Sequence, residues 1–283
     1  MSQPFPVTLS HFQVKPLLDA RRRAAANTFS SPDLGLTKVE VTLDDAGITF
    51  PTGERLTWAD ADEIADSDVG CFALEDGTIR KLQAFSEVTN RHCSLMPTTG
   101  APTLLIAGFP MHRIKGTEPY KDTQAKIKAA NPIGRVLDTS MGLGYTAIEA
   151  ARTATQVITI EIDPAVVEVA RQNPWSRELF ENPKIERRLG DSFDEVTEFE
   201  AQYFTRIIHD PPTMQLAGDL YSGEYYRELY RVLQPGGRLF HYIGDLDSPF
   251  GQRVSKGVVE RLGKAGFNRV TRRPEAFGIV AQK

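Results

Sequence analysis

Hydrophobic and polar residues follow two different patterns in this chain, and the change falls near residue 130. Beyond that point, short apolar runs alternate with segments in which apolar residues recur at helical spacing, which predicts alternating strands and helices. The predicted strands cover residues 135–138, 156–162, 184–189, 205–210, 238–243, 268–273 and 277–282, and the predicted helices cover residues 145–153, 164–172, 192–199, 224–233 and 252–266. Such alternation is typical of βαβ units, in which helices cover both faces of a mostly parallel sheet.

Before residue 130 the apolar residues recur with a period of two. Val39, Val41 and Leu43 alternate with polar residues, and turns rich in Asp, Gly and Pro follow at residues 44–47 and 51–54. This combination is the usual signature of β-hairpins. We therefore expect a compact β-rich module in the first part of the chain.

Two segments outside the hairpins have helical composition, at residues 17–29 and 121–130. The second is followed by an Asn-Pro pair that ends it. We place the domain boundary there. The N-terminal β-rich domain then covers residues 1–130, which we expect to be the substrate-side module, and the α/β domain covers residues 131–283.

Composition and charge exclude several classes of protein. The 283 residues are 41% hydrophobic and carry a net charge of −4, which is ordinary for a globular protein and speaks against a surface devoted to nucleic acid. Cys71 and Cys93 are too few for a disulfide framework, and the scattered histidines lack metal-ligand spacing, so we expect no metal. Neither a membrane-spanning apolar run nor a signal peptide is visible, so we expect a cytoplasmic protein.

The segment at residues 136–148 reads as a buried strand, a glycine-rich loop and the start of a helix. Gly142 and Gly144 allow a tight turn in which backbone can approach a ligand closely, and Tyr145 and Thr146 begin the helix. Ligands of open α/β sheets bind at the carboxyl ends of the strands. The glycines alone match a dinucleotide pattern and would equally allow NAD.

Three acids narrow the choice of ligand, because each ends or follows a predicted strand. Asp138 precedes the glycine loop, where a carboxylate would repel a pyrophosphate but hold an ammonium group. Glu161 can accept hydrogen bonds from ribose hydroxyls, which does not exclude NAD. Asp191 alone would be explained as a helix N-cap, but in this series it can accept from an adenine amino group, with Phe193 packed on the base. S-adenosylmethionine (SAM) has the ammonium and lacks phosphate.

With these residues the chain resembles the class I, Rossmann-like, SAM-dependent methyltransferases over residues 132–283. The resemblance implies an α/β fold with a seven-stranded sheet and a C-terminal hairpin, here preceded by the N-terminal β-rich domain. It also implies SAM as cofactor. The cofactor residues that we assign are Asp138, Gly142, Gly144, Tyr145, Thr146, Glu161, Ile162, Asp191, Ser192 and Phe193.

More narrowly, the chain is similar to a group of archaeal-type methyltransferases that have no assigned substrate and are often filed near spermidine synthases. The segments at residues 89–98, 108–119, 171–180 and 207–213 carry this similarity. No substrate follows from it.

The loop after the fourth strand of the α/β domain is the predicted place of chemistry. There we assign His209, Asp210, Pro211 and Pro212 as catalytic candidates. In the family, an acid or amide followed by two prolines and an aromatic residue marks methyl transfer to nitrogen. Thr213 replaces the aromatic residue, which puts nucleobase and amide acceptors in doubt. A carboxylate suits an amine, because it attracts a cation and accepts its proton.

Strand alternation points His209 away from Asp210, so packing or a supporting hydrogen bond competes with a direct role. His241 and Tyr242, at the end of the fifth strand, face the same rim, and Tyr221 and Tyr225 either border the pocket or form one packed helix face. The acceptor stays open between an amine-bearing small molecule, which we favour, and RNA or protein. A homodimer is also possible.

Three other functions compete with methyl transfer. An aminopropyltransferase of the spermidine-synthase type shares the fold, but its glycine loop is usually richer than the one here. An NAD(P)-dependent oxidoreductase is disfavoured by Asp138 and by the loop at residues 209–212. A non-catalytic SAM- or RNA-binding protein would account for the long N-terminal module but not for an apparently complete active-site loop.

Overall fold

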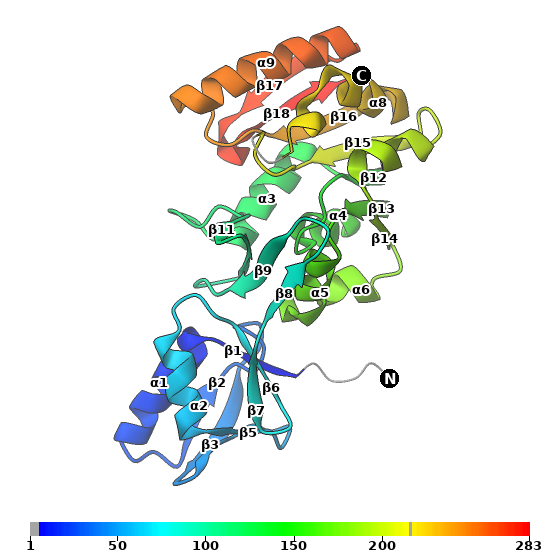
Figure 1. Cartoon of the computed structure of the whole chain (residues 1–283). Helices are drawn as coiled ribbons and strands as arrows, with labels where there is room; N and C mark the ends of the chain where they lie inside the picture. The colour runs from blue at the N-terminus through cyan, green and yellow to red at the C-terminus, as the bar shows by residue number, and fades with distance from the viewer. Residues whose placement is uncertain (1–5, 215–216) are drawn as a thin grey trace. The chain divides into compact units, whose positions relative to one another are not determined.

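The computed structural model describes residues 6–214 and 217–283. The chain divides into two compact units (Figure 1). Unit 1 comprises Met1–Tyr120 with Glu168–Arg177, and unit 2 comprises Lys121–Val167 with Glu178–Lys283. We predicted a boundary at residue 130. The division instead falls after Tyr120, so most of the helix at Pro119–Ala130 belongs to unit 2.

Unit 1 contains three small antiparallel sheets and two longer helices. The strands of the first sheet are β1 (Val7–Leu9), β6 (Phe72–Glu75) and β7 (Thr78–Lys81); of the second, β2 (Asn27–Ser30), β3 (Val39–Asp44), β4 (Gly47–Thr49) and β5 (Arg55–Thr57); of the third, β8 (Gln83–Ser86), β9 (Arg91–Met96), β10 (Thr103–Ile106) and β11 (Phe109–Pro110). The helices are α1 (His11–Arg22) and α2 (Trp58–Asp66). The prediction of a β-rich N-terminal region is confirmed.

The hairpin pattern of β3 accounts for its packing. Val41 and Leu43 are buried, while Glu40, Thr42 and Asp44, which alternate with them, are exposed. At the following turn, the Asp44 carboxylate accepts hydrogen bonds from the amides of Ala46 and Gly47 at 2.8 and 3.0 Å. Aspartate is favoured in turns because its short carboxylate can accept hydrogen bonds from the turn amides.

Both helices of unit 1 differ from the prediction. The helix expected at residues 17–29 begins earlier, because Ser10 and Gln13 form a capping box, and residues 27–30 form strand β2 instead. Helix α2 was not predicted. Thr57 caps it by accepting a hydrogen bond from the Asp60 amide at 3.1 Å, a signal that the sequence offers.

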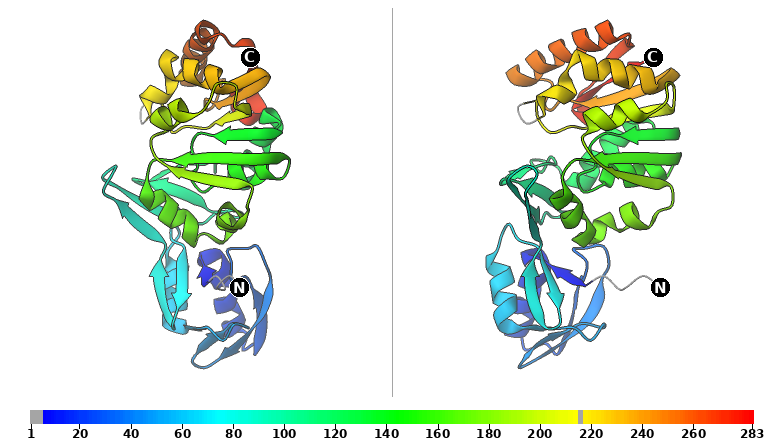
Figure 2. Two further views of the ribbon diagram at one scale, coloured as in Figure 1. Left: turned by 90° about the vertical axis from the view of Figure 1, so that its right-hand side faces the viewer. Right: turned by 45° about the vertical axis from the view of Figure 1, so that its right-hand side comes forward.

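Unit 2 is built on one seven-stranded sheet with the order β14-β13-β12-β15-β16-β18-β17. Figure 2 shows its strands from two further sides, coloured from green to red. The strands are β12 (Gly134–Asp138), β13 (Ala154–Glu161), β14 (Ile185–Leu189), β15 (Phe204–His209), β16 (Leu233–Tyr242), β17 (Asn268–Arg273) and β18 (Gly278–Gln282). Strands β12 to β16 are parallel, and β18 is antiparallel to both β16 and β17. The predicted seven-stranded sheet with a C-terminal hairpin is confirmed.

One helix precedes the first of these strands in the chain, and the others fill the connections between the strands, of which residues 168–177 belong to unit 1. The helices are α3 (Pro119–Ala130), α4 (Tyr145–Ala151), α5 (Pro164–Gln172), α6 (Arg177–Glu181), α7 (Ser192–Glu195), α8 (Gly223–Val232) and α9 (Pro249–Ala265), with 3₁₀ turns η1 (Pro174–Ser176), η2 (Val196–Glu198), η3 (Gly218–Tyr221) and η4 (Pro274–Ala276). The helix predicted at residues 192–199 is therefore shorter, and a 3₁₀ turn completes it. Tyr225, Tyr226 and Leu229 of α8 are buried in the core of unit 2.

The glycines of the loop between β12 and α4 make different demands. Gly142 and Gly144 have φ angles of +52° and +76°, where a side chain costs about 1–2 kcal/mol. A Cβ atom at Gly144 would lie 2.5 Å from Leu179 Cδ2, whereas a Cβ atom at Gly142 would meet nothing within 4 Å. Gly144 is therefore required for packing as well as for backbone conformation.

We expect Gly144→Ala to lower the free energy of unfolding by the backbone cost plus about 1–3 kcal/mol of steric overlap. Gly142→Ala should incur the backbone cost alone. Urea unfolding of the two variants, without ligand, measures the difference. Equal destabilisation would show that Leu179 does not restrict the position.

Candidate active site

The parallel strands of unit 2 bring the predicted acids to one edge of the sheet. Asp138 ends β12 and Glu161 ends β13, while Asp210 follows β15, the other neighbour of β12. The loop after β12 is fixed on both sides: the Thr139 amide donates to the Ile208 carbonyl at 3.1 Å, and the Met141 amide donates to the Ile160 carbonyl at 2.8 Å. The loop is thus held by both neighbouring strands.

The Asp138 carboxylate is fully buried and only half satisfied. Its Oδ2 accepts hydrogen bonds from the hydroxyls of Thr146 and Thr159 at 3.0 and 2.9 Å. Its Oδ1 has no hydrogen-bond partner among the described residues. Burial raises the pKa of Asp138 to about 7, although the threonine hydroxyls and the nearby Ser140 amide oppose the rise. A buried oxygen without a donor fits a ligand that brings one, such as the ammonium of SAM.

Glu161 connects the glycine loop to the next strand. Its two oxygens accept hydrogen bonds from the amides of Gly142 and Asp163 at 2.9 and 3.1 Å, and burial raises its pKa to about 7. An ionised carboxylate has further lone pairs for hydroxyl donors, so these contacts are compatible with ribose binding.

Two apolar side chains are exposed beside Glu161. Ile162 follows Glu161 in the chain and is 46% exposed. Leu189 on β14 is the register partner of Glu161 and is 59% exposed. Exposed apolar residues at strand ends provide a surface for a planar base. Leu189 was not predicted, because a strand pattern alone does not show which apolar residue stays exposed.

The residues after β14 combine capping with packing. Asp191 caps α7 by accepting from the Phe193 amide at 2.8 Å. The Ser192 hydroxyl lies 2.7 Å from the Tyr225 hydroxyl, and the Phe193 ring stacks on the Tyr225 ring with centroids 5.8 Å apart. The adenine contacts assigned to these residues stay predictions. Tyr145 is buried at the start of α4, and the hydroxyl of the neighbouring threonine holds Asp138.

Asp210 is paired with a residue that the sequence did not single out. Its Oδ2 accepts a hydrogen bond from Lys126 Nζ of α3 at 2.6 Å. The same ammonium lies 3.0 Å from Asp122 Oδ2 and 4.3 Å from the centre of the Tyr242 ring. Burial raises the pKa of Asp210, and Lys126 opposes that rise. The loop therefore presents a carboxylate that is oriented by an internal cation.

His209 is fully buried, and both of its ring nitrogens have partners. Nδ1 lies 2.7 Å from the Thr139 hydroxyl, and Nε2 lies 3.0 Å from the Leu220 carbonyl. Since a carbonyl only accepts, Nε2 carries the proton and Nδ1 accepts from the threonine. Burial lowers the pKa of His209 to about 3, so the ring is neutral. This geometry favours a supporting role over a direct one.

Buried tyrosines contact the Asp210–Pro212 loop and the neighbouring strand β16. The Tyr221 hydroxyl donates to the Pro212 carbonyl at 3.1 Å, and the Tyr226 hydroxyl lies 2.9 Å from His241 Nε2. His241 is buried, so it belongs to these buried contacts and does not line an open pocket. Tyr221 holds the second proline of the loop directly.

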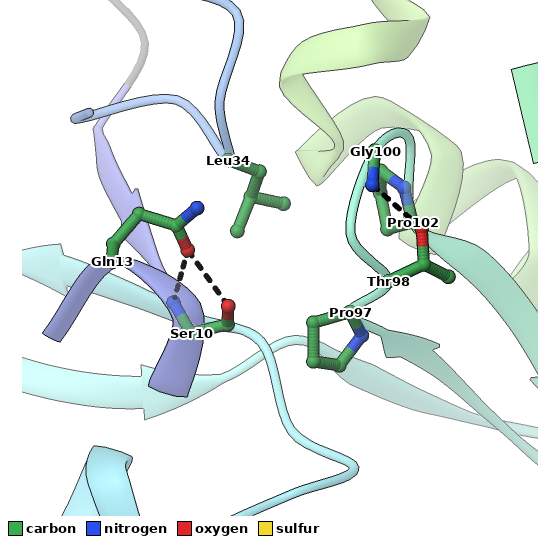
Figure 3. Close-up of a pocket in the computed structure, with 7 residues that line it drawn as sticks. All are labelled: Ser10, Gln13, Leu34, Pro97, Thr98, Gly100 and Pro102. Atoms are coloured by element: carbon green, nitrogen blue, oxygen red, sulfur yellow. Dashed lines mark hydrogen bonds between the residues drawn. The ribbon is translucent and has the colours of Figure 1, made fainter. Parts of the chain in front are cut away.

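Unit 1 also has a small hollow, which Figure 3 shows. Its lining residues are Ser10, Gln13, Leu34, Pro97, Thr98, Gly100 and Pro102, around an empty volume of about 150 Å³. Ser10 and Gln13 bond to each other there as a helix cap. None of the lining side chains is titratable, and the 150 Å³ includes open solvent, so the hollow encloses almost no space for a ligand. The hollow therefore offers no chemistry to compare with the sheet edge.

The described part of the chain covers residues 6–214 and 217–283. In that part of the chain, His, Cys, Asp and Glu side chains form no cluster of three or more that could hold a metal ion. Within the same residues, every helix is too short or too polar to cross a membrane.

Several known proteins are similar to this chain. The profile of a family described as "Methyltransferase domain" matches residues 136–237. Uncharacterized protein MJ1233 of Methanocaldococcus jannaschii is 46% identical over 237 residues, which cover 83% of this chain and 80% of that protein. Putrescine N-methyltransferase 2 of Nicotiana tabacum is 29% identical over 149 residues, covering 49% of this chain and 41% of that enzyme.

Among solved structures, spermidine synthase in complex with the transition state analogue AdoDATO shares the fold. The TM-score is 0.56 at 19% sequence identity, with 70% of this chain and 71% of that chain covered. The match to the methyltransferase domain, together with the strand order, identifies the protein as a SAM-dependent methyltransferase of class I. The chain belongs to the family of MJ1233, within the class I methyltransferases that lie near the spermidine synthases. SAM is its cofactor.

If the SAM ammonium binds Asp138 as the sequence predicts, the raised pKa of this carboxyl makes SAM binding depend on pH. In the free protein this carboxyl is largely protonated below its pKa of about 7, whereas the SAM ammonium favours the ionised form. Binding below pH 7 must therefore release a proton. We expect affinity for SAM to rise with pH up to about pH 7, by at most about tenfold per unit for this group, and then to level off.

Calorimetric titrations in two buffers of different ionisation enthalpy measure the proton release at each pH. In Asp138→Asn, binding should weaken and release fewer protons, the remainder arising from Glu161, whose pKa is also raised to about 7. Proton uptake on binding, or an affinity that falls as pH rises towards 7, would contradict the assignment of Asp138.

Proposed function

We propose that this protein transfers the methyl group of SAM to the nitrogen of an amine, and that Asp210 with the Pro211–Pro212 loop orients the acceptor. The observation that carries the proposal is the state of the Asp210 carboxylate. Lys126 holds Oδ2, Oδ1 accepts no hydrogen bond among the described residues, and the side chain is 18% exposed. One oxygen is thus fixed, and the other is open to a donor.

The surroundings of Asp210 favour a cation over a neutral acceptor. An ammonium already lies between this carboxylate and the face of the Tyr242 ring, and both groups attract cations. The two prolines of the loop contribute carbonyl groups but no N–H donors. The exposed Thr213 offers no aromatic face for a planar base. Each feature favours an N–H donor such as an aliphatic amine.

Methyl transfer to nitrogen requires a lone pair aimed at the methyl carbon. SAM, when bound, supplies an electrophilic methyl group on a sulfonium that leaves as a thioether. The amine must be neutral when it forms the new N–C bond, so an acceptor that arrives as an ammonium must first lose a proton, and the product forms as a methylated ammonium. Asp210, whose pKa is raised by burial, is suited to receive that proton.

The geometry leaves His209 without this role. Its ring is neutral, its pKa is lowered to about 3 by burial, and both nitrogens bond to protein groups. Of the two ionisable side chains in the loop, Asp210 is therefore the better candidate for proton transfer.

The relatives support an amine acceptor, although the chain spans less than half of putrescine N-methyltransferase 2. The names of that enzyme and of spermidine synthase both refer to polyamines. The shared fold also keeps aminopropyl transfer as a second candidate. Aliphatic diamines and polyamines, beginning with putrescine, are therefore the first acceptors to test.

We expect Asp210→Asn to lower kcat with an active amine by about 10²–10⁴-fold, because the amide cannot take a proton. Its affinity for SAM should stay near the parental value. Asp194→Asn, at an exposed position of α7, is the matched control and should turn over normally. Normal turnover by Asp210→Asn would refute the proposed role.

The nature of the transferred group is a separate prediction. Incubation with an amine panel and either SAM or decarboxylated SAM, followed by mass spectrometry, separates a methylated product from an aminopropylated one. We expect methylation with SAM and no aminopropylated product. Aminopropylation alone would establish the second candidate, and methylation of RNA or protein alone would refute the small amine.

A further inference from the structure

We propose that Lys126 is a positioning residue for methyl transfer: it holds one oxygen of Asp210, keeps that carboxylate ionised and leaves the other oxygen to the acceptor amine. The inference rests on the proposed function, because it assigns how Asp210 is prepared for the acceptor. It concerns the geometry and charge of Asp210, which can be measured without knowing the acceptor.

Lys126 is fixed from three directions. Its side chain is 3% exposed, and its ammonium lies 2.6 Å from Asp210 Oδ2 and 3.0 Å from Asp122 Oδ2. The Tyr242 ring lies 4.3 Å away on a further side. Burial lowers the pKa of Lys126, but the two carboxylates outweigh burial and hold it above its ordinary value. The side chain is therefore a fixed cation and not a neutral nucleophile.

Stability alone is a poor reason for this arrangement. A buried ion pair contributes little or nothing relative to apolar residues of the same volume, because both charges lose their hydration. The effect of Lys126 falls instead on Asp210. The ammonium occupies one oxygen of the carboxylate and so leaves the other oxygen for a further donor.

The charge around Asp210 also depends on Lys126. Four other groups surround the pair of Asp210 and Lys126: Asp122 of α3, Asp138 of β12 and Tyr221 of η3 interact with Asp210, and Tyr242 of β16 interacts with Lys126. All four are acids or phenols, and His209 beside Asp210 is neutral. Lys126 is the one cation among these groups. Without it, nearby carboxylates would repel one another and disfavour ionisation of Asp210.

Two variants should therefore change the pKa of Asp210 in opposite directions. Lys126→Met removes the cation and should raise the pKa by about 1–3 units. Asp122→Asn removes a neighbouring negative charge and leaves the Lys126 pair, so it should lower the pKa. Lys128→Met, an exposed position on the same helix, should leave it unchanged.

Carboxyl carbon NMR of protein labelled at aspartate measures these values in the full chain, with Asp210→Asn identifying the resonance. Turnover of SAM with putrescine gives a second readout. The acid limb of kcat/KM should move to higher pH in Lys126→Met and to lower pH in Asp122→Asn, and kcat of Lys126→Met should fall on the order of tenfold to a hundredfold.

An unchanged Asp210 titration in folded Lys126→Met would overturn the inference. If that variant does not fold, Asp122→Asn decides, and the absence of a downward shift would overturn it. The NMR titration of Asp210 needs no acceptor, so it tests the role of Lys126 even if putrescine is not a substrate. Failure of the proposed function would appear separately, as normal turnover by Asp210→Asn.

Discussion

Placing several carboxylates at one buried edge of a sheet is the constraint on which unit 2 depends. Parallel strands end at the same side, so β12, β13 and β15 bring Asp138, Glu161 and Asp210 close together. Buried charges need partners. Threonine hydroxyls, loop amides and the Lys126 ammonium provide them, and these bonds join the cofactor loop, the neighbouring strands and α3 to the sheet.

The architecture of unit 2 could be predicted from the sequence because its signals are local. The spacing of apolar residues predicts each strand and helix. The handedness and short length of connections between parallel strands then limit the possible topologies. Unit 1 was harder, since its strands are short and its helices begin at capping residues. The sequence contains the capping box of Ser10 and Gln13 and the Thr57 cap of α2. Each is a signal of one or two residues, which the surrounding hairpin pattern outweighs.

For the site, the sequence predicted the acids but not their partners. Asp138, Glu161 and Asp210 follow strands, so their positions follow from the topology. Lys126 lies far from Asp210 in the chain, and its spacing from Asp122 shows only that the two share a helix face. Whether that face is buried depends on how α3 packs. The engagement of His209 by Thr139 likewise appears only when the loop after β12 meets β15.

The partners also explain how one edge can serve two ligands. Asp138 has hydroxyl partners, which carry no charge, so burial raises its pKa to about 7 and leaves an oxygen ready for a cationic cofactor. Asp210 has an ammonium partner, which opposes the effect of burial. Two carboxylates in different surroundings thus acquire different chemistry. On the proposed assignments, Asp138 gains its cation when the cofactor binds and Asp210 already has one, so the cofactor and the acceptor amine need not compete for the same acid.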